Sequence, residues 1–246
     1  MSILPTDLSG LDIWLKADAL SLADNDPVSS WTDSSGNARH AVQANGVQQP
    51  LFKTNVLNGK AVVRGDGSND KLISTYTFGT TCTLFMVGRA VTGIANQRWF
   101  AAGANDKLTL FDTPGQFAFY STEGGGFPTI GGTSTNFTIV TFRASSQSNL
   151  DIYLNGTLSS VAAVNPSDFS GQTSLVLFDD VVAGTGDVGN VDIAELIVFS
   201  TALSTTDRQE IEWYLAEKYA ISGPTDPTPE ATIARFMHIY GQRSGG

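Results

Sequence analysis

Two acidic residues in one apolar run are the first candidates for chemistry. Asp192 and Glu195 lie in the segment VDIAELIVF, residues 191–199. Hydrolysis of a glycosidic bond needs two carboxyl groups that flank the bond, about 5 Å apart for retention or about 6.5–9.5 Å apart for inversion. Because side chains alternate between the two faces of a strand, a separation of three places these two carboxylates on opposite faces. We therefore expect no glycosidase acid pair here.

Histidine and cysteine are too scarce for the usual metal and nucleophilic sites. The chain has two histidines, His40 and His238, and one cysteine, Cys82. Zinc is normally held by three or four His, Cys or carboxylate ligands, so a zinc site would need unusual ligands. A serine–histidine pair that uses His40 stays open at this point. We expect His238 to be solvated and Cys82 to be a small core residue that forms no internal disulfide.

Oxygen-rich loops make calcium the metal that the sequence fits best. These loops lie at residues 24–26, at 66–70 and in the run DDVVAGTGDVGN, residues 179–190. None has the ligand spacing of a known calcium loop, and turns closed by Asp or Asn side chains use the same residue types. We therefore predict structural turns and no cofactor. Calcium remains the alternative for one set of side chains, namely Asp179, Asp180, Asp187 and Asn190.

Aromatic side chains could provide a site for sugars, which stack on exposed rings that have amides and acids beside them. Trp99, Tyr120 and Phe127 fall in or near segments that we expect to form loops at the rim of the fold. Phe127 follows EGGG, residues 123–126, which is too rich in glycine to be pure core. We therefore predict that these three residues bind a glycan.

Composition and charge exclude several kinds of partner. The 246 residues include 14 Lys or Arg and 24 Asp or Glu, which gives a formal net charge of −10. Because no basic cluster is present to neutralise phosphates, we expect no nucleic-acid binding. No run approaches the roughly 18 apolar residues of a membrane-spanning helix, and residues 1–10 lack the regions of a signal peptide. We expect a protein that is made in a reducing cytoplasm and does not insert into membranes.

Short apolar runs with a period of two dominate residues 11–199 and predict an all-β fold. Clusters of Gly, Asn, Asp and Ser separate these runs, and roughly a dozen strands fit at the spacing of a sandwich. The clearest signal is LDIYLNGTLSSV, residues 150–161. Its Asn155–Gly156 pair tolerates the positive φ of a type I′ turn and predicts a tight hairpin. The run 191–199 becomes continuously apolar, so we expect its end to be covered on both faces.

One long helix is predicted after the strands. Ser204 is a good N-cap and Asp207 takes the third helical position. Apolar residues then recur on one face of the helix, and SGP at residues 222–224 is expected to end it. That face consists of Ile211, Tyr214, Leu215 and Tyr219.

Residues 222–246 have a composition of their own and form a separate segment in our interpretation. SGPTDPTP, residues 222–229, contains three of the nine prolines and is typical of a stiff linker. The spacing beyond it predicts a short amphipathic tail helix, which either folds back on the sandwich or docks in a groove of a neighbouring subunit. Its apolar face, the predicted docking surface, consists of Ile233, Phe236, Met237 and Tyr240.

Three segments carry a family resemblance. They are LDIWLKAD (11–18) with VSSWTDSSGNARHAVQ (28–43), QQPLFKTNVLNGKAVVRGDGSNDKL (48–72), and VDIAELIVFSTALSTTDRQEIEWYLAEKYAI (191–221). Together they resemble the laminin-G-like or concanavalin-A-like jelly roll, in the variant common in bacterial surface proteins and phage structural proteins. The resemblance covers about residues 11–221 and implies a two-sheet antiparallel sandwich with a closing helix. It also implies a structural turn at His40 and core positions for Trp14, Trp31 and Trp213.

The resemblance fixes the fold more tightly than the function, because this fold hosts many functions. Some members bind sugars or calcium at rim loops. Laminarinase-like members carry alternating acids on one strand, a motif that is absent here. We therefore predict a non-catalytic binding protein with residues 1–221 as the sandwich, built into a phage virion as a capsid decoration or tail-associated protein and contacting other virion subunits. The alternatives are a lectin-type glycan-binding module on a bacterial cell surface and, third, a glycoside hydrolase.

Overall fold

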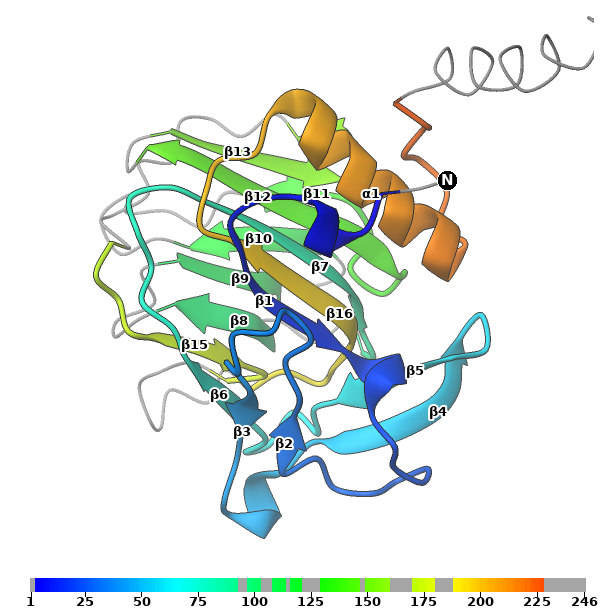
Figure 1. The fold of residues 1–246 in the computed structure, drawn as a ribbon. Coiled ribbons are helices and arrows are strands. Elements are labelled where there is room, and N and C mark those ends of the chain that lie inside the picture. The colour runs from blue at the N-terminus through cyan, green and yellow to red at the C-terminus, as the bar shows by residue number, and fades with distance from the viewer. Residues whose placement is uncertain are drawn as a thin grey trace, which may run out of the picture.

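The computed structural model describes residues 3–92, 97–102, 108–113, 116–120, 129–146, 149–159, 170–179 and 188–227. These residues form sixteen strands, the helix α1 (Thr205–Tyr219) and three short 3₁₀-helices at Pro5–Asp7, Ala17–Ala19 and Gly46–Gln48. The strands build two stacked sheets, and α1 lies across the outside of one of them (Figure 1). This arrangement confirms the predicted all-β sandwich with a closing helix.

Both sheets pair strands that are distant in the sequence, and all pairs are antiparallel. Sheet A, which contacts α1, has in spatial order β14 (Thr157–Leu158), β13 (Asn149–Leu154), β12 (Thr138–Ser146), β7 (Cys82–Ala90), β16 (Val191–Phe199), β5 (Lys60–Arg64) and β4 (Leu51–Leu57), while β1 (Leu11–Lys16) also pairs with β16. Sheet B has β11 (Thr129–Gly131), β10 (Gln116–Tyr120), β9 (Leu108–Thr113), β8 (Gln97–Ala102), β15 (Ser174–Leu177), β6 (Leu72–Thr75), β3 (Ala41–Val42) and β2 (Ser30–Trp31). The chain therefore crosses between the sheets repeatedly.

The main core fills the space between the sheets. Phe100 of sheet B meets Phe142 of sheet A edge to face, with ring centroids 5.4 Å apart. Trp31 and Cys82 are fully buried in the same cluster, and burial raises the pKa of the Cys82 thiol to about 12. Each fully buried large apolar side chain contributes about 1.5–3 kcal/mol. The predicted core positions of Trp31 and Cys82 are thus confirmed.

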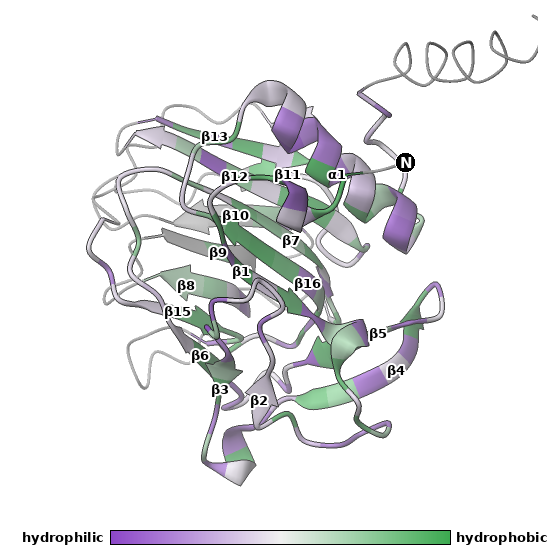
Figure 2. Ribbon diagram, viewed as in Figure 1, coloured by the Kyte–Doolittle hydropathy of each residue, from purple (hydrophilic) through white to green (hydrophobic). Residues whose placement is uncertain are grey.

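A second apolar cluster lies between sheet A and α1. All nine residues of β16 are buried, because sheet B covers one face of the strand and α1 covers the other, while β7, β5 and β1 pair along its edges. Figure 2 shows hydrophobic residues concentrated on the central strands, whereas α1 carries hydrophilic residues on its outer side. The prediction that this run is covered on both faces is confirmed.

Helix α1 begins where its cap predicts and ends earlier than the glycine and proline signals indicate. The Ser204 hydroxyl accepts the Asp207 N–H at 3.1 Å and donates to the Asp207 carboxylate at 2.8 Å. The helix ends at Tyr219, because Ala220 takes a left-handed conformation with φ of 51° and its N–H bonds to the Ala216 carbonyl. The helix therefore ends two residues before Ile221, the last position that the expected stop at residues 222–224 would allow.

One buried carboxylate joins the helix to the sheet. Glu195 of β16 is 1% exposed. Its Oε1 accepts Trp14 Nε1–H at 2.6 Å and the Tyr214 hydroxyl at 3.1 Å, and its Oε2 accepts the Tyr219 hydroxyl at 2.8 Å and Lys218 Nζ at 2.7 Å. A charge this deeply buried is tolerated only when donors surround it. Three of these four donors belong to α1, so the helix is held in register against β16.

Removal of the Glu195 carboxylate is expected to destabilise the fold strongly. The Glu195→Ala variant leaves Lys218 and two tyrosine hydroxyls without their buried acceptor, and breaking a buried pair in this way costs about 3–5 kcal/mol. Urea unfolding of the variant measures the loss. The matched control is Glu217→Ala on the exposed side of the same helix, where a change within about 0.5 kcal/mol is expected. Equal effects of the two substitutions would contradict the role assigned to Glu195.

Candidate functional site

The two acids of β16 lie on one face of sheet A, which corrects the expectation that they face opposite ways. Val191 and Ile193 pack in the core between the sheets, so Asp192 points to the helix side. The pairing of β16 with β7 shifts between Ile193 and Glu195, which is a β-bulge. Ala194, the extra residue, packs with the α1 cluster. The bulge thus reverses the alternation and turns Glu195 to the helix side as well.

Both carboxylates are nevertheless occupied by structural partners. Asp192 is fully buried and accepts Arg64 Nε at 2.6 Å, a second Arg64 nitrogen at 2.9 Å and Arg89 Nε at 2.9 Å. Glu195 is held by the four donors described above. A glycosidase needs one carboxyl group that can hold a proton and a second that faces the same substrate. This arrangement fits an internal charge network instead.

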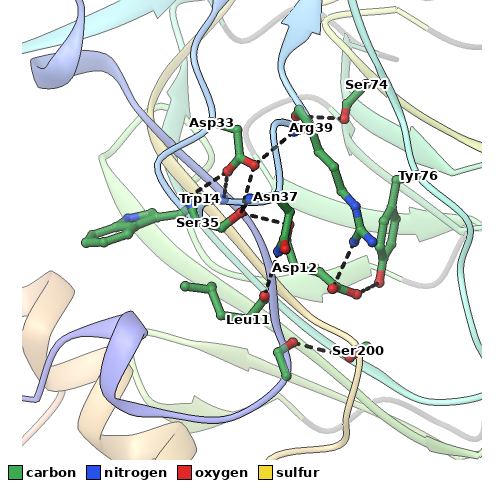
Figure 3. A network of polar contacts seen from close by, with 11 residues as sticks. Leu11, Asp12, Trp14, Asp33, Ser35, Asn37, Arg39, Ser74, Tyr76 and Ser200 are labelled. Carbon is green, nitrogen blue, oxygen red and sulfur yellow. Dashed lines mark hydrogen bonds and ion pairs between the residues drawn. The ribbon is translucent and has the colours of Figure 1, made fainter.

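The turn that precedes His40 is a second polar centre, and it too is structural; Figure 3 shows the contacts that Asp33 makes within it. Asp33 accepts backbone N–H groups of Trp14, Ser35 and Arg39 at 2.8–3.0 Å and the Ser35 hydroxyl at 2.7 Å. Burial alone would raise the pKa of Asp33, but these donors outweigh it, so the pKa lies below its ordinary value. His40 Nδ1 accepts the Asp33 N–H at 3.0 Å, as expected for a hydrogen-bonded structural histidine.

The predicted glycan-stacking residues do not form an exposed platform in the described structure. Trp99 is fully buried, with its ring 5.0 Å from that of Phe117, so its expected place in a rim loop is wrong. The pairing of β8 with β9 shifts between Arg98 and Phe100, and this bulge turns Trp99 into the core. Of Tyr120 the structure describes the backbone at the end of β10, and Phe127 lies outside the described residues.

The acidic loops that suggested a calcium site use their carboxylates in hydrogen bonds and ion pairs with the protein itself. Asp66 accepts the N–H groups of Ser68 at 2.7 Å and Asn69 at 3.2 Å, and Asp70 accepts the Asp66 N–H at 2.9 Å. Asp179 pairs with Lys71 at 3.2 Å. In the part of the chain that the structure describes, no three acidic, His or Cys side chains cluster as a metal site would require. Asn190 is described with its main chain bound to Val91, whereas Asp180 and Asp187 lie outside.

A pocket of about 420 Å³ opens on the helix side of sheet A. This volume lies in the range of roughly 300–1,000 Å³ that is usual for small-molecule sites. None of the described side chains that line it is charged. Its polar side chains are Asn58, Thr133, Asn136, Thr138, Asn155 and Ser222, and its larger apolar ones are Leu57, Phe137, Leu154 and Ile221.

Three chain reversals from distant parts of the sequence build this pocket together with residues 132–138, which lead from β11 into β12. Asn58–Gly59 joins β4 to β5 and Asn155–Gly156 joins β13 to β14, and all four residues have positive φ between 47° and 81°. Positive φ at both central residues marks type I′ turns, which confirms the predicted hairpin at Asn155. The end of α1 at Ala220 is the third reversal, and it lies near the hairpin of β4 and β5 (Figure 1). The sequence predicts the turn at Asn155–Gly156, but it carries no signal that the three reversals share one pocket.

The start of the linker packs against one of these turns. A Cβ at Gly223 would lie 2.7 Å from the Asn155 carbonyl oxygen, and a Cβ at Gly156 would lie 3.4 Å from Pro224 Cα. The predicted docking residues Ile233, Phe236, Met237 and Tyr240 lie outside the described residues. No described helix combines the length and hydrophobicity needed to cross a membrane.

Comparisons with known proteins support the fold alone. No protein-family model and no curated protein sequence matches this chain, so the laminin-G-like family stays a resemblance. The binding domain of botulinum neurotoxin DC matches in complex with rat synaptotagmin II (TM-score 0.58) and with SialylT (0.57), each at 14% identity over 84% of this chain. This chain spans about half of that domain, 52% of its length.

Two further structures show the same architecture. The binding domain of Paraclostridial Mosquitocidal Protein 1 has a TM-score of 0.60 and 11% identity over 87% of this chain and 53% of its own length. The sialidase of Trypanosoma rangeli, in complex with 2,3-difluorosialic acid, has a TM-score of 0.56 and 13% identity over 87% of this chain and 34% of its own. Identities this low establish a shared sandwich fold and leave the activity to be argued from the site.

Asp70 is expected to make stability depend on pH. Burial, with the neighbouring Asp66 carboxylate, raises the pKa of Asp70 from 3.8 to about 6. The folded state therefore holds this proton more tightly than the unfolded state, so its stabilising contribution is full below about pH 4 and is lost as the pH rises through 6. Asp70→Asn keeps an oxygen acceptor for the Asp66 N–H. The free energy of unfolding of the wild type should decline between pH 4 and 7. In this variant the decline should be smaller by about 2 kcal/mol, after allowance for solvent screening.

Urea unfolding at several pH values measures this difference, with Glu217→Gln as the control on an exposed carboxylate. An Asp70→Asn protein whose stability falls with pH as steeply as that of the wild type would rule out Asp70 as the cause.

Proposed function

We propose that this chain is a non-catalytic binding module. The proposal rests on the hydrogen bonds of two buried acids. The Asp192 and Glu195 carboxylates lie on one face of sheet A, but each of their four oxygens accepts a hydrogen bond from another side chain of the protein. No proton-transferring carboxyl group is left over from this pair. The glycoside hydrolase alternative therefore cannot use Asp192 and Glu195 as its pair of acids.

The structural neighbours support recognition as the function. Two are described as binding domains of toxins, and one of these is seen with a protein, synaptotagmin II, and with SialylT. The sialidase shows that an enzyme can also contain this architecture. Since fold does not imply function, these neighbours add weight only together with the uncharged pocket of this chain, which has the chemistry of a recognition site.

The finer proposal is that the module belongs to a phage virion, attached to other subunits through residues 222–246. Two features support it. The chain beyond residue 221 is rich in proline and then carries regularly spaced apolar residues. Residues 222–246 contain two acids and two bases, so the net charge of −10 resides in the sandwich. An acidic body that stays soluble and a neutral attachment segment fit a subunit assembled on a larger particle. A bacterial surface lectin is the second candidate, favoured by the pocket.

Truncation separates attachment from folding. Deletion of residues 228–246 leaves the Gly223–Pro224 contact intact, so the melting temperature of the sandwich should stay within a few degrees of the wild type. Incorporation into particles should be lost. The measurement is co-sedimentation with virion particles after co-expression with phage capsid and tail proteins of the same genome, with the full chain as the reference. Undiminished co-sedimentation of the truncated chain would refute attachment through this segment.

A further inference from the structure

We infer that the pocket between the two Asn–Gly turns and the end of α1 is a binding site for a neutral sugar. The inference rests on the proposed function, because it names the ligand class of a recognition module. Neutral sugars need two kinds of contact at once: planar amides and hydroxyls for their hydroxyl groups, and an apolar surface for the C–H face of the ring. The lining of this pocket supplies both and adds no charged group.

Two asparagine side chains of the pocket each use one polar atom of the amide in a hydrogen bond with the protein. The other polar atom of each amide is left for a ligand. Asn58 Nδ2 donates to the Tyr219 carbonyl at the end of α1, and Asn155 Oδ1 accepts the Ile139 N–H at 2.9 Å. In the described structure the Asn58 Oδ1 acceptor and the Asn155 Nδ2 donor have no protein partner. The pocket therefore displays one fixed acceptor and one fixed donor. Amides that are already oriented bind a ligand with little further loss of side-chain entropy.

A third amide is unused by the fold. Only the main chain of Asn136 takes part in hydrogen bonds: its N–H donates to the Thr133 carbonyl at 3.1 Å, and its carbonyl accepts the Thr138 hydroxyl at 3.0 Å. The exposed Asn136 side chain can thus both donate and accept. Vicinal hydroxyl groups of a sugar, each a donor and an acceptor, match such a side chain.

The apolar surface comes from Phe137 and two leucines. The Arg89 guanidinium lies 4.7 Å from the centre of the Phe137 ring, and Arg89 is itself fixed by its ion pair with Asp192. This contact anchors a half-buried ring beside Leu57 and Leu154 in the lining of the pocket. Anchored aromatic and aliphatic carbon is the surface on which the C–H groups of a sugar ring pack.

The charges favour a neutral ligand over an acidic one. Arg89, whose guanidinium lies over the Phe137 ring of the lining, is bound to the buried carboxylate of Asp192. The chain carries a net charge of −10, so its field repels anionic ligands. A peptide or a sialylated glycan would bring charges that nothing in the lining neutralises. We therefore expect neutral hexose-type glycans to be preferred over their sialylated counterparts.

The test uses the full chain on an array of neutral oligosaccharides and their sialylated forms, followed by titration calorimetry with the best neutral glycan. The protein is produced in bacteria, because Asn136 and Asn155 each begin an Asn-X-Thr acceptor sequence for N-glycosylation. Asn155→Asp keeps the oxygen that accepts the Ile139 N–H and removes the Nδ2 donor. We expect it to weaken binding by at least about tenfold, the effect of losing roughly one ligand hydrogen bond.

Asn69→Asp is the matched control, since it adds the same charge in an exposed turn outside the pocket, and it should bind as the wild type does. Asn136→Ala is the second test variant, because it removes only a side chain that the fold does not use. Melting temperatures near that of the wild type show that the variants are folded.

Three results would overturn the inference. The first is a wild-type chain that binds no neutral glycan, and the second is a preference for sialylated forms. The third is neutral glycan binding that both Asn155→Asp and Asn136→Ala leave unchanged, which would place the sugar elsewhere. None of these results bears on particle attachment, because the co-sedimentation experiment involves no sugar. The failure of this site is thus distinguishable from the failure of the proposed function.

Discussion

The buried carboxylate of Glu195 is the constraint on which the rest of the structure depends. A charge at 1% exposure is stable only inside a complete set of donors, and three of its four donors come from α1. The helix therefore has one permitted position on sheet A. That position sets where Tyr219 and Ala220 end the helix, and so where one wall of the pocket stands. A β-bulge in β16, an irregularity of one residue, makes this possible by turning Glu195 towards the helix.

The pocket shows how uncharged residues with a structural purpose can acquire a second one. Asparagine is favoured in type I′ turns because it tolerates positive φ, and this accounts for Asn58 and Asn155 without any ligand. Their side chains remain available after the turn is made. One polar atom of each amide forms a hydrogen bond with a neighbouring element: Asn58 bonds to the end of α1 and Asn155 bonds to β12. In the proposed sugar site the other polar atom of each amide is left for the ligand, so the same side chain would serve both folding and recognition.

Sequence reasoning predicted what local chemistry determines. The cap at Ser204, the helical face that contains Tyr214 and the turn at Asn155 each depend on a few neighbouring residues, and all three are confirmed. The incorrect predictions concern side chains whose direction depends on how neighbouring strands pair. The bulge in β16 reversed the facing of Glu195, and strict alternation cannot reveal a bulge. Trp99 was expected in a rim loop, but it lies in β8 with its side chain in the core. Asn58 and Asn155 come from hairpins at opposite edges of sheet A and line one pocket together with the end of α1, an arrangement that no local pattern encodes. The acids of residues 66–70 illustrate a further ambiguity, since a self-closing turn and a calcium loop use the same residue types.

The contact of Gly223 and Pro224 with the Asn155–Gly156 turn has a mechanical consequence. The chain leaves the sandwich along the wall of the pocket, and Ile221 and Ser222 belong to both. A pull on the chain beyond this point is resisted first by the lining of the pocket and only afterwards by α1 and sheet A. If the chain is attached through residues 222–246 as proposed, tension on that segment would act on the lining of the proposed sugar site.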